Sequence, residues 1–164
     1  MIDKIVKEIE LTEEGRAEII INIKPFDELE LRNVKFKLDT GADITTINKN
    51  ELKVLGYGKE WISNNMSKHP ALTITRAGSK NEPAYYVQIP KCNILGRDLF
   101  NWPIYIRPET DKDFPNLLGI DILHNFDFDF RYSSGILAIW PINESYIKIP
   151  MLASQEIFAV KSSS

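Results

Sequence analysis

Apolar and polar residues alternate along much of the chain with a period of two, which is typical of β-strands with one buried face. Residues 34–38, Val-Lys-Phe-Lys-Leu, follow this pattern, and residues 17–24 are rich in β-branched and apolar side chains. In residues 126–130, Phe-Asp-Phe-Asp-Phe, the rings fall on one face and the carboxylates on the other. Further short strands are predicted at residues 71–76, 84–89, 102–107 and 136–140, between clusters of Gly, Pro, Asn and Ser.

Two short helices are predicted among these strands. The first follows Asn48, which together with Glu51 resembles a capping box, and Gly56 ends it. The second spans residues 121–126, where the side chain of Asp121 can cap the first turn. These elements indicate a mainly β fold, a small and mainly antiparallel barrel or sandwich with one or two short helices.

The composition fits one globular domain. The chain has 164 residues, of which 43% are hydrophobic and 26% are charged, close to the average of soluble domains. The formal charge is −3 and no run of Lys and Arg stands out, so nucleic acid is not an expected partner. No apolar run approaches the roughly 20 residues that span a bilayer, so we expect no membrane partner.

Cysteine usage and the N-terminal residues bear on the compartment. The single cysteine, Cys92, excludes an intramolecular disulfide and a cysteine-based zinc site within one chain. Residues 1–8 contain no continuous apolar stretch, which is typical of a mature sequence and not of a signal peptide. We therefore expect a cytoplasmic protein, although a disulfide-free secreted protein would look the same. His69 and His124 show no ligand spacing with Cys92, so no metal is expected.

The segment most informative about chemistry is Leu38-Asp-Thr-Gly-Ala-Asp43, at the end of a predicted strand. Gly41 permits a tight turn and the close approach of another backbone. Taken alone, Asp-Thr-Gly fits an ordinary turn between two strands equally well. A second segment, Leu117-Leu118-Gly119, precedes the predicted helix at 121–126 and the last hydrophobic strands. This combination favours a functional loop over a chance match.

Together these segments resemble the retropepsin-like aspartic proteases, the family of retroviral proteases and their cellular and bacterial relatives. The resemblance covers residues 17–140. It implies a small closed β-barrel of the retropepsin type that works as a two-fold homodimer, in a bacterial or other cellular member of the family. Residues 1–16 would then be an N-terminal extension or strand, and residues 141–164 a C-terminal extension and tail.

The resemblance also implies an activity that needs no cofactor, the aspartic endopeptidase cleavage of an extended peptide or protein substrate. Such enzymes use two carboxylates, one ionised to take a proton from a water molecule and one protonated to bind the scissile carbonyl. Two carboxylates about 3 Å apart share a proton, because both cannot ionise. The chain has one Asp-Thr-Gly, so a homodimer would supply Asp39 from each subunit.

Residues around Asp39 receive their roles from the same resemblance. Thr40 would hydrogen-bond across the dimer interface and rigidify the two loops. Gly41 would offer its carbonyl to the main chain of the substrate, Asp43 would contact that main chain farther from the cut, and the small Ala42 would pack beneath. The residues that would pack behind the catalytic loop are Leu117, Leu118 and Gly119.

A flap, a hairpin that covers the substrate, is expected between the two motifs at residues 72–87. Ala77 and Gly78 would form its flexible tip and contact the substrate, and Tyr85 and Tyr86 would lie over or under the ligand. This tip contains less glycine than the retroviral pattern.

The C-terminal motif also departs from the retroviral pattern, in which an Arg often follows the Gly and pairs with the acid that corresponds to Asp43. Here Ile120 follows Gly119, whereas the upstream copy, Gly96-Arg97-Asp98, does carry the Arg. We favour Gly119 as the motif glycine because a strand, a turn and a final strand follow it. Arg97 is then expected to be a solvated loop cation.

Two other hypotheses stand beside the protease. A non-catalytic dimerisation or peptide-binding module with the retropepsin fold could hold an extended peptide by strand addition without cutting it. The intact Asp-Thr-Gly argues against such a module, which has no need for paired carboxylates that repel each other. Alternatively, the chain could be an unrelated small barrel in which the triplet is a chance match.

Overall fold

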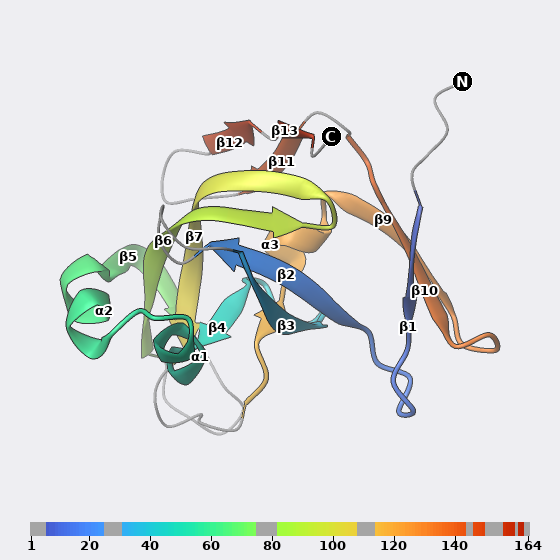
Figure 1. The fold of residues 1–164 in the computed structure, drawn as a ribbon, viewed down its shortest axis with the longest axis horizontal. Helices are drawn as coiled ribbons and strands as arrows, with labels where there is room; N and C mark the ends of the chain where they lie inside the picture. The colour runs from blue at the N-terminus through green and yellow to red at the C-terminus, as the bar shows by residue number, and fades with distance from the viewer. Residues whose placement is uncertain are drawn as a thin grey trace.

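Six strands close into a β-barrel. The computed structural model describes residues 6–24, 31–74, 82–107, 114–143, 146–149, 156–159 and 161–162. The order around the barrel is β7 (Arg97–Arg107), β4 (Thr46–Asn48), β8 (Leu117–Leu118), β3 (Arg32–Leu38), β2 (Glu18–Lys24) and β6 (Glu82–Ile94). Pairing of β6 with β7 completes the circle (Figure 1). The predicted mainly β fold with a closed barrel is therefore confirmed.

The remaining strands extend the barrel or lie beside it. β5 (Ser67–Ile74) adds to β6, and β13 (Lys161–Ser162) adds to β7. A separate three-stranded sheet, at the right of Figure 1, contains β1 (Lys7–Glu10), β10 (Ile136–Pro141) and β9 (Phe126–Arg131). β11 (Tyr146–Ile149) pairs with β12 (Glu156–Ala159).

The period-two alternation places side chains as predicted. On β3, Val34, Phe36 and Leu38 are buried while Lys35 is exposed. On β9, Asp127 and Asp129 are exposed, as a strand with one solvated face requires. The strands predicted at 84–89 and 102–107 lie within longer strands, because β6 and β7 pair along most of their length as one hairpin.

Two of the helices lie where the sequence predicts them. Before α1 (Lys49–Val54), the side chain of Asn48 accepts a hydrogen bond of 2.9 Å from the backbone N–H of Asn50. The second, α3 (Ile120–Leu123), begins one residue before Asp121, so Gly119 and not Asp121 is its N-cap. The capping function expected of Asp121 is replaced by the hydrogen bonds described below.

One helix, α2 (Lys59–Asn65), was not expected. Its N-cap residue, Gly58, provides no side-chain hydrogen bond, and Ile62 is its single buried residue. The segment therefore shows neither a capping signal nor an apolar stripe at helical spacing. Within the ranges that the structure describes, every helix is too short or too polar to cross a membrane.

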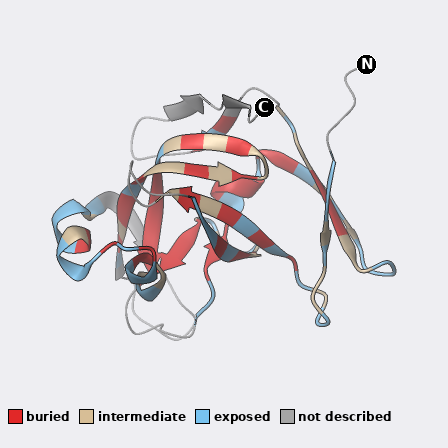
Figure 2. Ribbon diagram, viewed as in Figure 1, coloured by how far each residue is buried: buried red, intermediate tan, exposed pale blue. Residues whose placement is uncertain are grey.

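The core fills the barrel and continues under β10 and β11. Trp102, Tyr57 and Phe36 are among its largest fully buried side chains. Leu137 of β10 and Ile147 of β11 belong to the same hydrophobic cluster. Figure 2 shows buried residues along the barrel strands and exposed turns on α1 and α2. The barrel and the neighbouring strands thus share one core.

The core predicts unequal effects for two adjacent isoleucines on β2. Ile21 is 0% exposed and pairs with Val34 and Ile94, whereas Ile20 is 53% exposed. We expect Ile21→Ala to lower the free energy of unfolding by about 2–5 kcal/mol, because it leaves a cavity in the core. Ile20→Ala, the matched control, should change it by less than about 1 kcal/mol. Urea denaturation followed by tryptophan fluorescence measures both, and equal losses would contradict this packing.

Candidate active site

The Asp-Thr-Gly segment lies in a loop that passes the end of β8. β8 lies between β3 and β4, parallel to β3 and antiparallel to β4. Leu118 pairs with Leu38, and Leu117 pairs with both Lys37 and Thr46. The chain must therefore leave β3 and pass the end of β8 before it enters β4. Residues 39–45 make this connection.

Hydrogen bonds to the backbone fix Asp39 at the start of the loop. The Asp39 N–H donates to the carbonyl of Leu118 at 3.0 Å, so strand pairing extends one residue past β3. The Gly41 N–H donates to Oδ1 of Asp39 at 2.9 Å, and the Ala42 N–H donates to the Asp39 carbonyl at 3.2 Å. The Asp39 carboxylate is half-buried. It is thus oriented by its own loop and still open to solvent.

The residues after Asp39 differ in exposure. Thr40, Gly41 and Asp43 are exposed, whereas Ala42 is half-buried. The tip of the loop exposes polar side chains and the backbone of Gly41 to solvent. Another chain can therefore contact it. The two segments that the sequence singles out, residues 38–43 and 117–119, do lie together.

Gly119 allows the chain after β8 to lie directly against the loop. A Cβ atom at this position would lie 2.6 Å from the carbonyl carbon and oxygen of Ile44 and 2.8 Å from the Ala42 oxygen. The Ile120 N–H donates to the Ala42 carbonyl at 2.8 Å, and the Asp121 N–H donates to the Asp43 carbonyl at 3.3 Å. Glycine is therefore required here because there is no room for a side chain, and not because of an unusual backbone angle.

A buried pair, Thr45 and Asp121, ties the far end of the loop to α3. Oδ2 of Asp121 accepts from the Thr45 N–H at 3.0 Å, and Oδ1 accepts from the Thr45 hydroxyl at 2.7 Å. The same hydroxyl oxygen accepts from the Gly119 N–H at 3.0 Å. Thr45 is 1% exposed and Asp121 5%. Each end of the loop is thus held by hydrogen bonds, at Asp39 by β8 and at Thr45 by Asp121.

Asp121 is a site residue that sequence reasoning recognised only as a helix cap. The available signal was an acidic residue two positions after Gly119, within the otherwise apolar run 117–123. Ile120, which stands where the retroviral pattern has Arg, is 42% exposed. The loop is therefore braced by a buried carboxylate on the residue after Ile120.

Burial controls the protonation of two groups beside the loop. It raises the pKa of Asp121 above the ordinary value of 3.8, while the hydrogen bonds from Thr45 and Ile122 act in the opposite direction. The pKa of Tyr105 rises to about 12, first through burial and then through the charges of Asp121 and Tyr86. The Tyr105 hydroxyl therefore stays protonated at neutral pH.

β5 and β6, which pair antiparallel, overlap the residues 72–87 for which the sequence predicts a flap. Thr73 pairs with Pro83 and Ile74 with Glu82. Ala77 and Gly78 lie outside the described residues. At the base, Tyr86 packs on Tyr105, with ring centroids 5.7 Å apart, in a small cluster that also includes Ala84 and the partly buried Ile44. The hairpin base therefore contacts the residue that follows Asp43. Tyr85 is half-buried.

The upstream Gly-Arg-Asp copy lies at the turn between β6 and β7. Gly96 has a φ of 86° there, and its N–H donates to the Asn93 side chain at 3.1 Å. The prediction that Arg97 is solvated was wrong, since it is 8% exposed on β7. Pairing of the long β6–β7 hairpin draws it into the protein. Among the described residues, no group of three or more His, Cys, Asp and Glu side chains could hold a metal ion.

The close approach at Gly119 predicts a large effect of one added methyl group. Gly119→Ala should lower the free energy of unfolding by about 3 kcal/mol or more, because the methyl group would meet backbone atoms that cannot rotate away. At Gly58 a Cβ would meet nothing within 4 Å, so Gly58→Ala should cost about 1 kcal/mol or less. Urea denaturation of the two variants makes the comparison, and equal costs would refute the close approach.

The buried carboxyl of Asp121 predicts how stability depends on pH. Its folded-state pKa is raised above 3.8, so the folded protein binds this proton more tightly than the unfolded chain does. Its contribution is therefore present at low pH and is lost as the pH rises through the raised pKa. The stability difference between the wild type and Asp121→Asn should shrink from about pH 4 towards neutral pH. Urea denaturation at several pH values measures it, and a difference that grows with pH would mean that the Thr45 hydrogen bonds outweigh burial.

Comparison with known proteins gives a match in structure. No protein-family model matches the chain, and no curated protein matches it. The crystal structure of a retropepsin-like aspartic protease from Rickettsia conorii is similar over 83% of this chain and 92% of that one, with a TM-score of 0.58 and 22% sequence identity. The six-stranded barrel found here agrees with this likeness. The chain thus has a retropepsin-like fold, as its sequence predicted.

Proposed function

We propose that the protein is an aspartic endopeptidase that works as a two-fold homodimer, with Asp39 of each subunit as the catalytic residue. The observation that carries this proposal is the Asp39 loop itself. A half-buried carboxylate, oriented by the Gly41 N–H at 2.9 Å, stands beside the exposed residues Thr40 and Gly41. The likeness of the fold to a retropepsin-like aspartic protease supports the same chemistry.

The proposed reaction needs two carboxylates and one water molecule. The ionised Asp39 takes a proton from the water as the water oxygen bonds to the scissile carbonyl carbon. The protonated Asp39 of the other subunit donates a hydrogen bond to the carbonyl oxygen. Transfer of that proton to the carbonyl oxygen gives a neutral tetrahedral diol and leaves the second carboxyl ionised. The C–N bond then breaks as the proton taken from water passes to the leaving nitrogen. One hydroxyl of the diol returns its proton to the second carboxyl, so the two carboxyls again share one proton.

The exposed tip of the loop supports a dimer. One chain supplies one such carboxylate, so a two-fold axis beside Asp39 would complete the site. Thr40, exposed in the single chain, would then be covered and would hydrogen-bond to the partner loop. We place the protease domain at residues 17–140, with extensions at 1–16 and 141–164.

The other residues have supporting roles in this proposal. Gly41, Ala42 and Asp43 would line the substrate path on one side, and Ala77 and Gly78 of the flap on the other. Leu117, Leu118 and Gly119 would hold the loop from behind, which agrees with the contacts of Gly119. The substrate would be an extended peptide or an unfolded protein segment.

A mixing experiment tests both the aspartic mechanism and the need for one Asp39 from each subunit. Asp39→Asn should abolish cleavage of denatured casein between about pH 4 and 7, because a neutral amide cannot activate water. In an equal mixture of wild type and Asp39→Asn that has exchanged subunits, about one quarter of the dimers keep both carboxylates. Activity per total protein should therefore fall to about one quarter of the wild-type value. Product peptides are quantified by mass spectrometry, and sedimentation reports the dimer.

Asp127→Asn is the matched control, since Asp127 is exposed on β9 and should leave cleavage unchanged. Inhibition by pepstatin, a mimic of the tetrahedral intermediate, should follow the wild-type activity. Cleavage retained in Asp39→Asn would refute the aspartic mechanism. A dimer that binds peptides but leaves them intact would instead support a non-catalytic peptide-binding module.

A further inference from the structure

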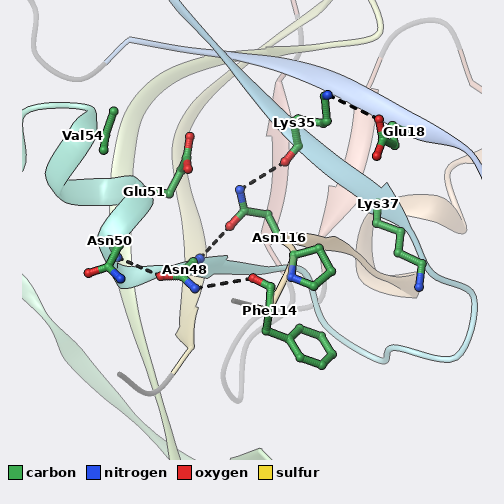
Figure 3. A pocket seen from close by; sticks show the side chains of 10 residues that line it. Glu18, Lys35, Lys37, Asn48, Asn50, Glu51, Val54, Phe114 and Asn116 are labelled. Atoms are coloured by element: carbon green, nitrogen blue, oxygen red, sulfur yellow. Dashed lines mark hydrogen bonds and ion pairs between the residues drawn. The ribbon is translucent and has the colours of Figure 1, made fainter. Parts of the chain in front are cut away.

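A hollow of about 320 Å³ reaches β3 immediately before the Asp39 loop. Its walls come from β3, from α1 and from residues 114–116 (Figure 3). Charged side chains of both signs line it, among them Lys35 and Lys37 of β3, Glu18 of β2 and Glu51 of α1. The hollow therefore lies outside the core, on the face of β3 that also leads to Asp39.

The alternation of β3 puts Lys37 on the same face as Asp39. Phe36 and Leu38 point into the core, so Lys37, between them, points to the opposite face. The Asp39 N–H still donates to the Leu118 carbonyl, so the strand geometry continues to this residue. The side chains of Lys37 and Asp39, two residues apart, therefore lie on the same face. Residues two apart on a strand are about 7 Å apart along it. The Lys37 ammonium and the Asp39 carboxylate thus lie on the same surface of the protein.

Among the described residues, Lys35 has an ion pair and its neighbour Lys37 has none. Lys35 is exposed and lies 3.4 Å from the carboxylate of Glu18. Lys37 is half-buried, and within the described residues its ammonium makes no ion pair or hydrogen bond. In Figure 3 its side chain extends away from the Lys35–Glu18 pair, while Glu51 lies across the hollow on α1. A half-buried cation with no ion pair in the described part of the chain favours a ligand that brings a negative charge.

The neighbouring polar groups are already engaged. Asn116 accepts from the Asn48 N–H at 2.7 Å and donates to the Lys35 carbonyl at 3.1 Å. The guanidinium of Arg107 donates to the Thr46 hydroxyl at 3.3 Å and lies 3.9 Å from the centre of the Phe114 ring. In this part of the described structure, Lys37 is therefore the cation left to meet a substrate.

We propose that Lys37 determines specificity and selects substrates with an Asp or Glu side chain next to the scissile bond. This inference rests on the proposed function. A bound peptide runs extended, at about 3.3 Å per residue, so the side chain within reach of Lys37 belongs to a residue that flanks the cut. The two-fold axis places one Lys37 on each side of the Asp39 pair, so the acidic residue is accepted on either side of the bond.

Cleavage-site mapping tests this specificity. Wild type, Lys37→Met, Lys37→Arg and Lys35→Met digest the same pool of proteome-derived peptides, and mass spectrometry locates the cuts. Wild type and Lys37→Arg should favour Asp or Glu at a position flanking the bond. In Lys37→Met the ratio of kcat/KM for a Glu peptide to that for its Gln counterpart should fall about tenfold, the scale of one charge-assisted contact. Lys35→Met, the matched control on the same face, should keep the wild-type ratio.

The outcomes separate this inference from the proposed function. Cleavage that needs Asp39 but shows no acidic preference, or a preference unchanged in Lys37→Met, would overturn the role of Lys37 and leave the protease standing. If wild type cleaves nothing, the proposed function fails. Peptide binding then tests whether Lys37 selects an acidic side chain. Fluorescein-labelled octapeptides, alanine-rich with one central Glu or Gln, are then titrated with the Asp39→Asn protein. Tighter binding of the Glu peptide that disappears in the double variant with Lys37→Met supports the inference, and equal binding of the two peptides refutes it.

Discussion

The Asp39 loop depends on the close approach of two backbone segments at Gly119. Any side chain there would meet the Ile44 carbonyl at 2.6 Å, so the chain after β8 lies against the loop only because this residue is glycine. That contact lets Ile120 and Asp121 donate backbone hydrogen bonds to the carbonyls of Ala42 and Asp43. The loop therefore has neighbours on its inner side along nearly its whole length. Its outer side, with Thr40 and Gly41, remains exposed.

This arrangement explains how a small barrel can hold the Asp39 side chain in a defined position. Loops are ordinarily mobile, and precise positions come from the strands and helices beneath them. Here the barrel orders β3, β8 and β4 side by side, and the loop only has to connect neighbours in that order. The Asp39 N–H still pairs with Leu118, so the side chain begins from strand geometry. The conformational entropy of the loop is thus lost when the barrel folds and not when a ligand binds.

The sequence predicted what local patterns determine and missed what distant contacts determine. The alternation in residues 34–38 and 126–130 predicted β3 and β9, because a strand with one buried face has a period of two. β8 is two residues long, too short to show any period, and only the Leu-Leu-Gly motif pointed to it. The tie between Thr45 and Asp121 joins residues 76 positions apart, so no local signal could pair them. Arg97 was misjudged for the same reason, since its burial depends on the packing of a long hairpin.

The two acidic residues that hold the ends of the loop, Asp39 and Asp121, differ in exposure and in the number of hydrogen bonds that they accept. Asp121 is 5% exposed and accepts hydrogen bonds from the Thr45 N–H, the Thr45 hydroxyl and the Ile122 N–H. A carboxylate with that many donors has little capacity left for a substrate or a water molecule. Asp39 is half-buried and accepts one such bond, from Gly41, which orients it and leaves lone pairs free. The Asp121 carboxylate, on α3, is thus suited to bracing the loop, whereas the Asp39 carboxylate, within the loop, keeps the lone pairs that the proposed reaction needs.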